Sequence, residues 1–308
     1  MHDQGLNLRE HPFLKAKKRG LKPDALEQYA AEAERMGEPG LHRILDAGKR
    51  WQNELNNTLA SGGAILCPHT YLSQSGYQIA AAVHACLDSR ADRILALGVF
   101  HPSVDELWVA RQRELNGEDI SNETSWGILG PSLERYDGWK SEFSLNFFKL
   151  LIKTEAQRRT IKEPFIIERY PSLCNRRPDQ LPGIEELIAL AKECPLVVSD
   201  DLCHHGIAYG VEPDHAKPLD EKGLQFAKER IEAGYCLLER GDYAAYFDHW
   251  MNPEAVGDPT DASSIMRYLL GPIQARVLDC KLVDVSALFA GEPKPSWVAT
   301  SLVAATPI

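Results

Sequence analysis

The sequence predicts one α/β domain with a central, largely parallel β-sheet and helices on both faces. Three short apolar runs, at residues 63–67, 93–100 and 195–199, are each followed by a histidine, and such runs are typical of buried parallel strands. Between the first two runs, residues 75–87 carry apolar side chains at helical spacing, as in a strand–helix–strand crossover. No repeat or low-complexity linker divides the chain, so residues 1–308 are expected to form a single domain.

The first sixty residues are expected to be a helical extension of this domain. Residues 1–22 are polar without a clear period, which indicates an arm over the surface. Helices are then predicted from Lys22 to about Gly37 and from Gly40 to Leu59, because a Lys-Pro-Asp sequence opens the first and Gly37 closes it.

The remaining elements follow from periodicity and from turn residues. Apolar side chains on a wide helical face predict a helix at 142–153. A strand is predicted at 106–110, and a short strand or a turn at 126–130. Further strands are predicted at 164–167, 276–288 and 296–305, and further helices at 184–192, 219–240, 242–250 and 261–270.

Composition argues against several classes of partner. The net charge is −10 and the only basic cluster is Lys15 to Arg19, which disfavours nucleic acid. No apolar run approaches membrane-spanning length, and Met1 to Gly20 lacks the apolar core of a signal peptide, so we expect no membrane partner and a cytoplasmic location. The seven cysteines are odd in number and lack CxxC spacing, which predicts reduced thiols. Homo-oligomerisation is left open.

Three histidines stand where predicted strands end. His69 and His101 follow two strands joined by one crossover, and His204 follows the third apolar run. Because the carboxyl ends of parallel strands border the ligand crevice of an α/β sheet, we expect these imidazoles to lie together. Imidazole is the commonest metal ligand, so the pattern indicates a metal site, although a lone strand-end histidine is more often a hydrogen-bonded surface residue.

Four segments of the chain resemble a known family. Residues 68–76, 98–101, 142–145 and 199–206 are similar, in the same order, to motifs of Memo-type proteins, which share a fold with class III extradiol dioxygenases of the LigB type. The resemblance begins at about Gly62 and covers most of the chain beyond it. It implies the same fold and a metal centre at the sheet edge.

The resemblance also implies a ligand set. The dioxygenases hold Fe(II) with two histidines and a carboxylate, whereas in Memo a cysteine that opens a late helix is the third ligand. Aligning that helix with this chain puts Asp261 at the ligand position, which implies a facial triad of His69, His101 and Asp261 with open coordination positions. Asp258 and Glu254 are the alternatives, and Asp261 also suits a helix N-cap.

The resemblance also implies an acid–base residue, and four further residues are candidates for the wall of the pocket. His204 is the expected acid–base residue, and Tyr71, Glu142, Arg177 and His205 are expected to contact the substrate. The leading hypothesis is an Fe(II)-dependent dioxygenase that uses O₂ to cleave the ring of a small catecholic or phenolic substrate. One alternative is a non-catalytic, Memo-like metal- or redox-binding protein. Another is a metal-dependent hydrolase, since three nitrogen or oxygen ligands and an activated water would also suit zinc.

Overall fold

The computed structural model describes residues 22, 27, 29, 31–101, 105–133, 135–174 and 176–308. Apart from Lys22, the arm predicted for residues 1–22 lies outside the described residues, as does most of the start of the first predicted helix. No helix among the described residues is both long and apolar enough to cross a membrane.

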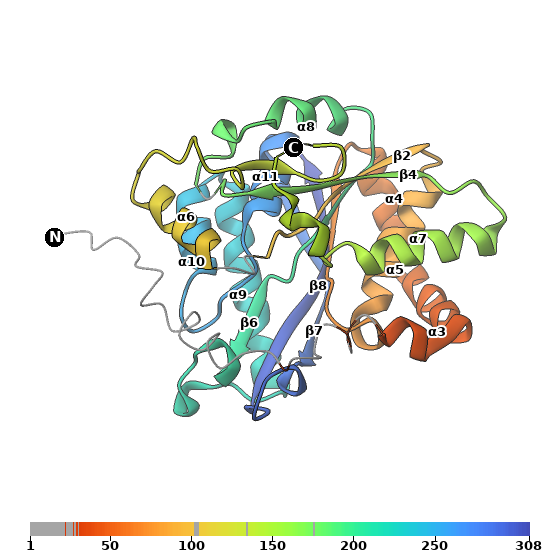
Figure 1. The fold of residues 1–308 in the computed structure, drawn as a ribbon. Coiled ribbons are helices and arrows are strands. Elements are labelled where there is room, and N and C mark those ends of the chain that lie inside the picture. Colours follow the sequence, from red (N-terminus) through yellow and green to blue (C-terminus); the bar gives the residue numbers. More distant parts are fainter. Residues whose placement is uncertain are drawn as a thin grey trace.

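An eight-stranded mixed sheet forms the centre of the molecule (Figure 1), which confirms the predicted α/β class. Its middle is parallel, in the order β4 (Phe165–Ser172), β2 (Arg93–Leu97), β5 (Leu196–Ser199), β1 (Ala64–Cys67). These four strands include the three apolar runs that predicted the sheet. Their carboxyl ends therefore lie at one edge, where the candidate site is found.

Antiparallel strands extend the sheet on both sides. β8 (Ser296–Pro307) pairs with β1 through its second half and with β6 (Cys203–Gly206) through its first half, and β7 (Ile273–Asp284) runs along its other edge. At the far side, β3 (Gly127–Leu129) pairs with β4. The two predicted tail strands are thus confirmed, and the sheet is mixed rather than wholly parallel.

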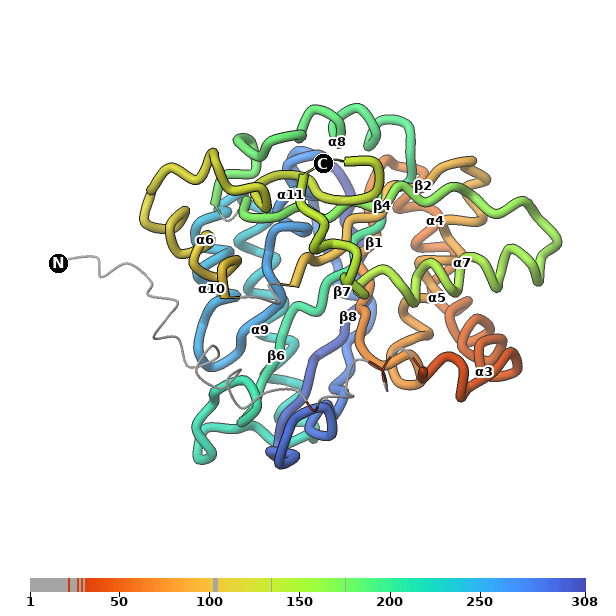
Figure 2. Tube along the Cα trace, viewed as in Figure 1, coloured from red at the N-terminus to blue at the C-terminus, as the bar shows by residue number. Residues whose placement is uncertain are grey.

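Helices cover both faces of the sheet, as predicted (Figures 1 and 2). Successive residues of β1 point to opposite faces, so Ile65 belongs to one apolar core and Leu66 to the other. The first core is covered by α3 (Glu32–Gly48), α4 (Gln52–Ala60), α5 (Leu72–Asp88) and α7 (Asn146–Arg159). The second is covered by α8 (Ile184–Ala191), α9 (Glu221–Glu239), α10 (Tyr243–Trp250) and α11 (Asp261–Leu270).

Two sequence predictions about local structure were wrong. The strand predicted at 106–110 is part of helix α6 (Asp105–Leu115), whose buried residues Leu107, Ala110 and Arg111 have helical spacing. The third apolar run ends as β5 at Ser199, and His204 lies in a separate strand, β6.

The predicted break between Gly37 and Gly40 appears as a kink within α3, where Gly37 has a φ of 60° that favours glycine.

A buried polar network joins the helices of the first core. The ring of His84 in α5 donates from Nε2 to the carbonyl oxygen of Leu45 at 2.6 Å and accepts at Nδ1 from Arg159 at 2.5 Å. Since a carbonyl only accepts and a guanidinium only donates, these bonds require the neutral tautomer with its proton on Nε2. Burial lowers the pKa of His84, which also favours the neutral ring.

This network predicts a loss of stability in acid. The pKa of His84 is lowered in the folded state, so below about pH 6.5 the unfolded chain binds more protons at this position and stability declines as pH falls. The variant His84→Gln keeps a donor for the Leu45 carbonyl but removes the titrating ring. We expect the free energy of unfolding, measured with urea between pH 7 and pH 5, to fall more steeply in the natural protein than in this variant. Parallel curves would contradict this assignment.

Candidate metal centre

Two strand ends bring the first two imidazoles together. His69 follows β1 and His101 follows β2, and β5 lies between these strands in the sheet. Their ring centroids are 5.2 Å apart. The crossover thus places the two rings at the carboxyl edge of the sheet, where the sequence predicted them.

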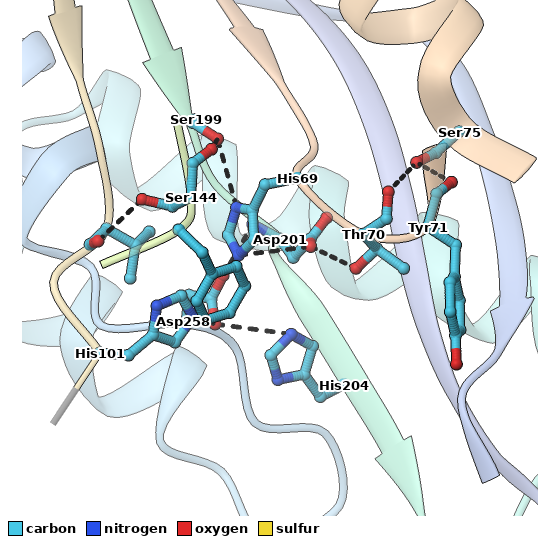
Figure 3. A network of polar contacts seen from close by, with 12 residues as sticks. His69, Thr70, Tyr71, Ser75, His101, Ser144, Ser199, Asp201, His204 and Asp258 are labelled. Carbon is cyan, nitrogen blue, oxygen red and sulfur yellow. Dashed lines mark hydrogen bonds and ion pairs between the residues drawn. The ribbon is translucent and has the colours of Figure 1, made fainter. Parts of the chain in front are cut away.

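The third member of the cluster is Asp258, from the loop before α11 (Figure 3). Its Oδ2 lies 3.3 Å from Nε2 of His69, and its Oδ1 lies 3.4 Å from Nε2 of His101. The backbone N–H of Asp201 also donates to Oδ2 of Asp258 at 3.0 Å, which orients the carboxylate. The three donor atoms lie within 4.8 Å of one another.

This donor set fits a metal ion. A metal about 2 Å from each ligand atom separates neighbouring ligand atoms by about 3 Å, close to the distances found here. Two imidazole nitrogens and one carboxylate oxygen on one side of a cavity are the donors of a facial triad, which suits Fe(II). His69, His101 and Asp258 could therefore hold a metal with little movement.

Hydrogen bonds fix the orientation of both imidazoles. The Ser199 hydroxyl donates to the carbonyl oxygen of Ser144 at 2.7 Å, so it must accept the Nδ1 proton of His69 at 3.2 Å. Nδ1 of His101 donates to Oε1 of Glu142 at 3.0 Å. Because both Nδ1 protons are engaged, Nε2 of each ring is the nitrogen directed at the cluster, in the arrangement typical of metal-binding histidines.

The charged groups of the cluster shift one another's pKa values. Burial opposes ionisation of Asp258, but His204, His101 and His69 outweigh it and hold the pKa of Asp258 well below its usual value. Burial likewise disfavours the charged form of His101, but Glu142 and Asp258 more than offset it and hold its pKa well above the usual value. Despite burial, the charge of His101 lowers the pKa of Glu142 to about 2. The lowered pKa values mean that Asp258 and Glu142 are ionised near neutral pH.

His204 reaches the same cluster from β6. Its Nε2 lies 3.6 Å from Oδ1 of Asp258, and its ring stacks on Tyr209 with centroids 4.9 Å apart. Burial lowers the pKa of His204, and the opposing influence of Asp258 and Asp201 does not cancel it, so the ring is neutral near neutral pH. Asp201, His204 and Asp258 form a second group of donor atoms, also within 4.8 Å of one another.

Asp261 does not lie in either group, and Asp258 stands where the sequence placed Asp261. The Asp261 carboxylate is buried beside Arg111, whose Nη2 is 2.6 Å away, and accepts from the backbone N–H of Cys174 at 2.7 Å. Helix α11 begins at Asp261, beyond the part of the chain that contacts the histidines, so Asp258 in the preceding loop contacts them instead. The N-cap of α11 is Thr260, so Asp261 is not the cap either.

The four residues predicted to contact the substrate do not lie together in the structure. Glu142 holds His101, while Tyr71 and Arg177 are not among the residues that line the adjacent cavity. His205 points away from His204 because successive residues of a strand face opposite sides. Its Nδ1 donates to a backbone carbonyl and its Nε2 accepts the backbone N–H of Lys217, so this ring has a structural role.

A cavity of about 420 Å³ opens over the cluster. His69, His101, His204, Asp201 and Asp258 form its polar wall. Most other lining side chains are aromatic or aliphatic: Tyr29, Trp108, Phe143, Tyr209, Phe247, Trp250, Met251, Val256, Val285, Leu288, Phe289 and Val298. Pockets of this size and lining are typical of small-molecule sites.

Sequence reasoning missed several of these residues. Asp201 accepts a hydrogen bond from Thr70 and lies within the 199–206 motif, but only His204 and His205 of that motif were expected to take part in the site. Tyr29 comes from the helical extension, outside the resemblance, and its buried hydroxyl has no hydrogen-bond partner among the described residues. The contribution of both residues to the site depends on how distant segments pack, which the sequence pattern does not show.

No protein-family model matches this chain, and no curated protein sequence matches it significantly. The resemblance to Memo-type proteins and LigB-type dioxygenases therefore stays a prediction. What the site does must be inferred from its donor atoms, its hydrogen bonds and its cavity.

Two isosteric variants distinguish the two aspartates. Asp258→Asn removes the charge of a proposed ligand, so we expect Fe(II) affinity to fall by more than about 100-fold. Mutating a residue that only hydrogen-bonds to a metal ligand costs at most about that much. Asp261→Asn should retain the metal but lose about 3 to 5 kcal/mol of stability, because it breaks a buried ion pair with Arg111. Iron titration and urea unfolding at low temperature measure both. Loss of iron in Asp261→Asn alone would restore Asp261 as the ligand.

The role of Glu142 predicts an intermediate effect. Glu142→Gln keeps the size of the side chain but removes the charge that orients His101. We expect Fe(II) affinity to fall by about 10- to 100-fold, as for other residues that support metal-bound histidines. Competition with a chromophoric chelator measures this change. An unchanged affinity would mean that Glu142 only supports the backbone N–H groups to which it is also bonded.

Proposed function

We propose that this protein is a non-haem Fe(II)-dependent dioxygenase that cleaves the ring of a catecholic substrate with O₂. The observation that carries the proposal is that one wall of the cavity holds both a set of metal-ligand side chains and a further imidazole that is not needed as a ligand. His69, His101 and Asp258 suffice as ligands, and a neutral third imidazole, His204, remains beside them. The four motifs that resemble those of Memo-type proteins, which share a fold with LigB-type dioxygenases, support the same interpretation.

Each residue has a distinct part in this chemistry. When bound, Fe(II) with three protein ligands and an open face would allow O₂ and a catechol to react side by side. Ser199 and Glu142 hold the two imidazoles in the tautomer that presents Nε2. The apolar walls exclude water from the reacting atoms, which strengthens the polar contacts made there.

His204 would move the proton. Its neutral imidazole can accept the proton of a substrate hydroxyl, which leaves a substrate oxyanion and an imidazolium. The imidazolium can later return that proton to an oxygen of the product. Asp258 and Asp201 lie close enough to stabilise the transient positive charge. All seven cysteines are unpaired, which suits the reducing cytoplasm that we propose as the protein's location and in which Fe(II) persists.

A metal-dependent hydrolase is the second candidate, and one observation favours it. Asp201, His204 and Asp258 form a donor group that shares Asp258 with the first group. A carboxylate shared between two donor groups suits a two-metal site that activates water. In that case His204 would be a ligand, two metal ions would bind per chain, and O₂ would not be consumed.

Replacing His204 tests the leading proposal. His204→Gln should bind one Fe(II) and a catechol as the natural protein does, but consume O₂ about 10²- to 10⁴-fold more slowly, the usual range for a lost acid–base group. His205→Gln is the matched control and should keep normal turnover per folded chain, because His205 faces away from the cavity. Oxygen-electrode traces with Fe(II)-loaded protein and a panel of catechols provide the measurement.

Two results would count against this assignment. Loss of iron in His204→Gln would make His204 a ligand and favour the hydrolase. Absence of O₂ uptake with every catechol by the iron-loaded natural protein would overturn the dioxygenase proposal.

A further inference from the structure

The cavity is much larger than a single catechol ring requires. A cavity of about 150 Å³ accommodates benzene, whereas this one holds about 420 Å³. The donor groups occupy only one wall, so a ring placed against them leaves most of the volume unfilled. Space for a second ring or a bulky chain therefore lies next to the reacting position.

The walls of the remaining space are mostly apolar. On one side are side chains from α6, α10 and the turn after α10: Trp108, Phe247, Trp250 and Met251. On another are side chains from β8 and from the segment between β7 and β8: Val285, Leu288, Phe289 and Val298. Such surfaces gain free energy by contact with apolar groups. Apart from the indole N–H groups of Trp108 and Trp250, the side chains named here carry no N–H or O–H group that could donate a hydrogen bond to a charged substituent.

The charges of the cavity disfavour an anionic substituent. Asp201 and Asp258 already place two carboxylates in its wall. Among the described lining residues Arg111 is the only arginine or lysine, and it is paired with the buried Asp261. His101 in the same wall is likewise already paired, with Glu142 and Asp258, so a substrate carboxylate would be desolvated there without a cation of its own, which is costly.

We infer that the substrate is an uncharged catechol with a bulky apolar substituent, such as a second aromatic ring. This inference rests on the proposed dioxygenase function for the catechol part and on the cavity alone for the substituent. The two parts can be tested separately.

Binding to metal-free protein tests the substituent without any turnover. Trp108 and Trp250 line the cavity, so quenching of tryptophan fluorescence reports its occupancy. 4-Phenylphenol should bind at least about tenfold more tightly than phenol, since a buried ring contributes that much or more. 4-Hydroxybenzoate should bind more weakly than phenol. Equal binding of all three would overturn the inference whatever the enzyme does.

Turnover tests the same preference in the iron-loaded protein. The expected order of kcat/KM is 4-phenylcatechol, then catechol, then 3,4-dihydroxybenzoate, with the first two about 10- to 100-fold apart. A preference for the carboxylate would overturn the inference while leaving the dioxygenase proposal intact. If no catechol is consumed, the dioxygenase proposal fails, and the binding of 4-phenylphenol alone decides whether the cavity takes a two-ring ligand.

A pair of neighbouring variants tests the charge argument. Leu288 is half-buried in the cavity wall, whereas Ala287 is exposed and is not among the lining residues. Leu288→Lys should raise kcat/KM for 3,4-dihydroxybenzoate relative to 4-phenylcatechol by about tenfold, because a charge-assisted hydrogen bond becomes available. Ala287→Lys should leave the ratio unchanged. An equal shift in both variants would point to general attraction of anions, and no shift in Leu288→Lys would contradict the proposed position of the substituent.

Discussion

The candidate site depends on one buried carboxylate that three imidazoles share. Asp258 lies within 3.6 Å of nitrogen atoms from His69, His101 and His204, and burial without them would strongly disfavour its charge. The donor atoms of the site are therefore held in place by contacts among themselves, because the histidines and the carboxylate stabilise one another. Such pre-organisation lowers the cost of binding a metal, since few side chains need to be reordered.

The fold supplies the rigid frame for this contact. His69 and His101 follow β1 and β2, which are separated in the parallel part of the sheet by β5, and β8 pairs with β6, which carries His204. Asp258 enters from a loop, but the backbone N–H of Asp258 donates to the Asp201 carbonyl at 3.1 Å, so this loop is tied to the strand end. Behind the rings, Ser199 and Glu142 restrict rotation. The polar wall thus rests on the sheet, whereas the apolar walls come from helices and connecting segments that differ more readily between proteins.

Sequence reasoning predicted the parts of the site that follow from local pattern. His69 and His101 were predictable because each ends a short apolar run, and the crossover between those runs fixes their neighbourhood. The third proposed ligand could not be predicted in this way, because Asp258 and Asp261 are both acidic residues near the start of the same helix. Only the packing of Arg111 against Asp261 separates their roles. The strand predicted at 106–110 failed for a related reason, since a short half-buried helix and a strand carry similar apolar residues. The aromatic cavity had no signal, because its walls come from segments far apart in the chain.

The position of a bound metal tests the account most directly. Crystals of protein loaded with Fe(II) without O₂ would show iron by its anomalous scattering. We expect one iron per chain, about 2 Å from Nε2 of His69, Nε2 of His101 and a carboxylate oxygen of Asp258, with His204 beyond bonding distance. Iron bound instead by Asp201 and His204, or by Asp261, would contradict the account.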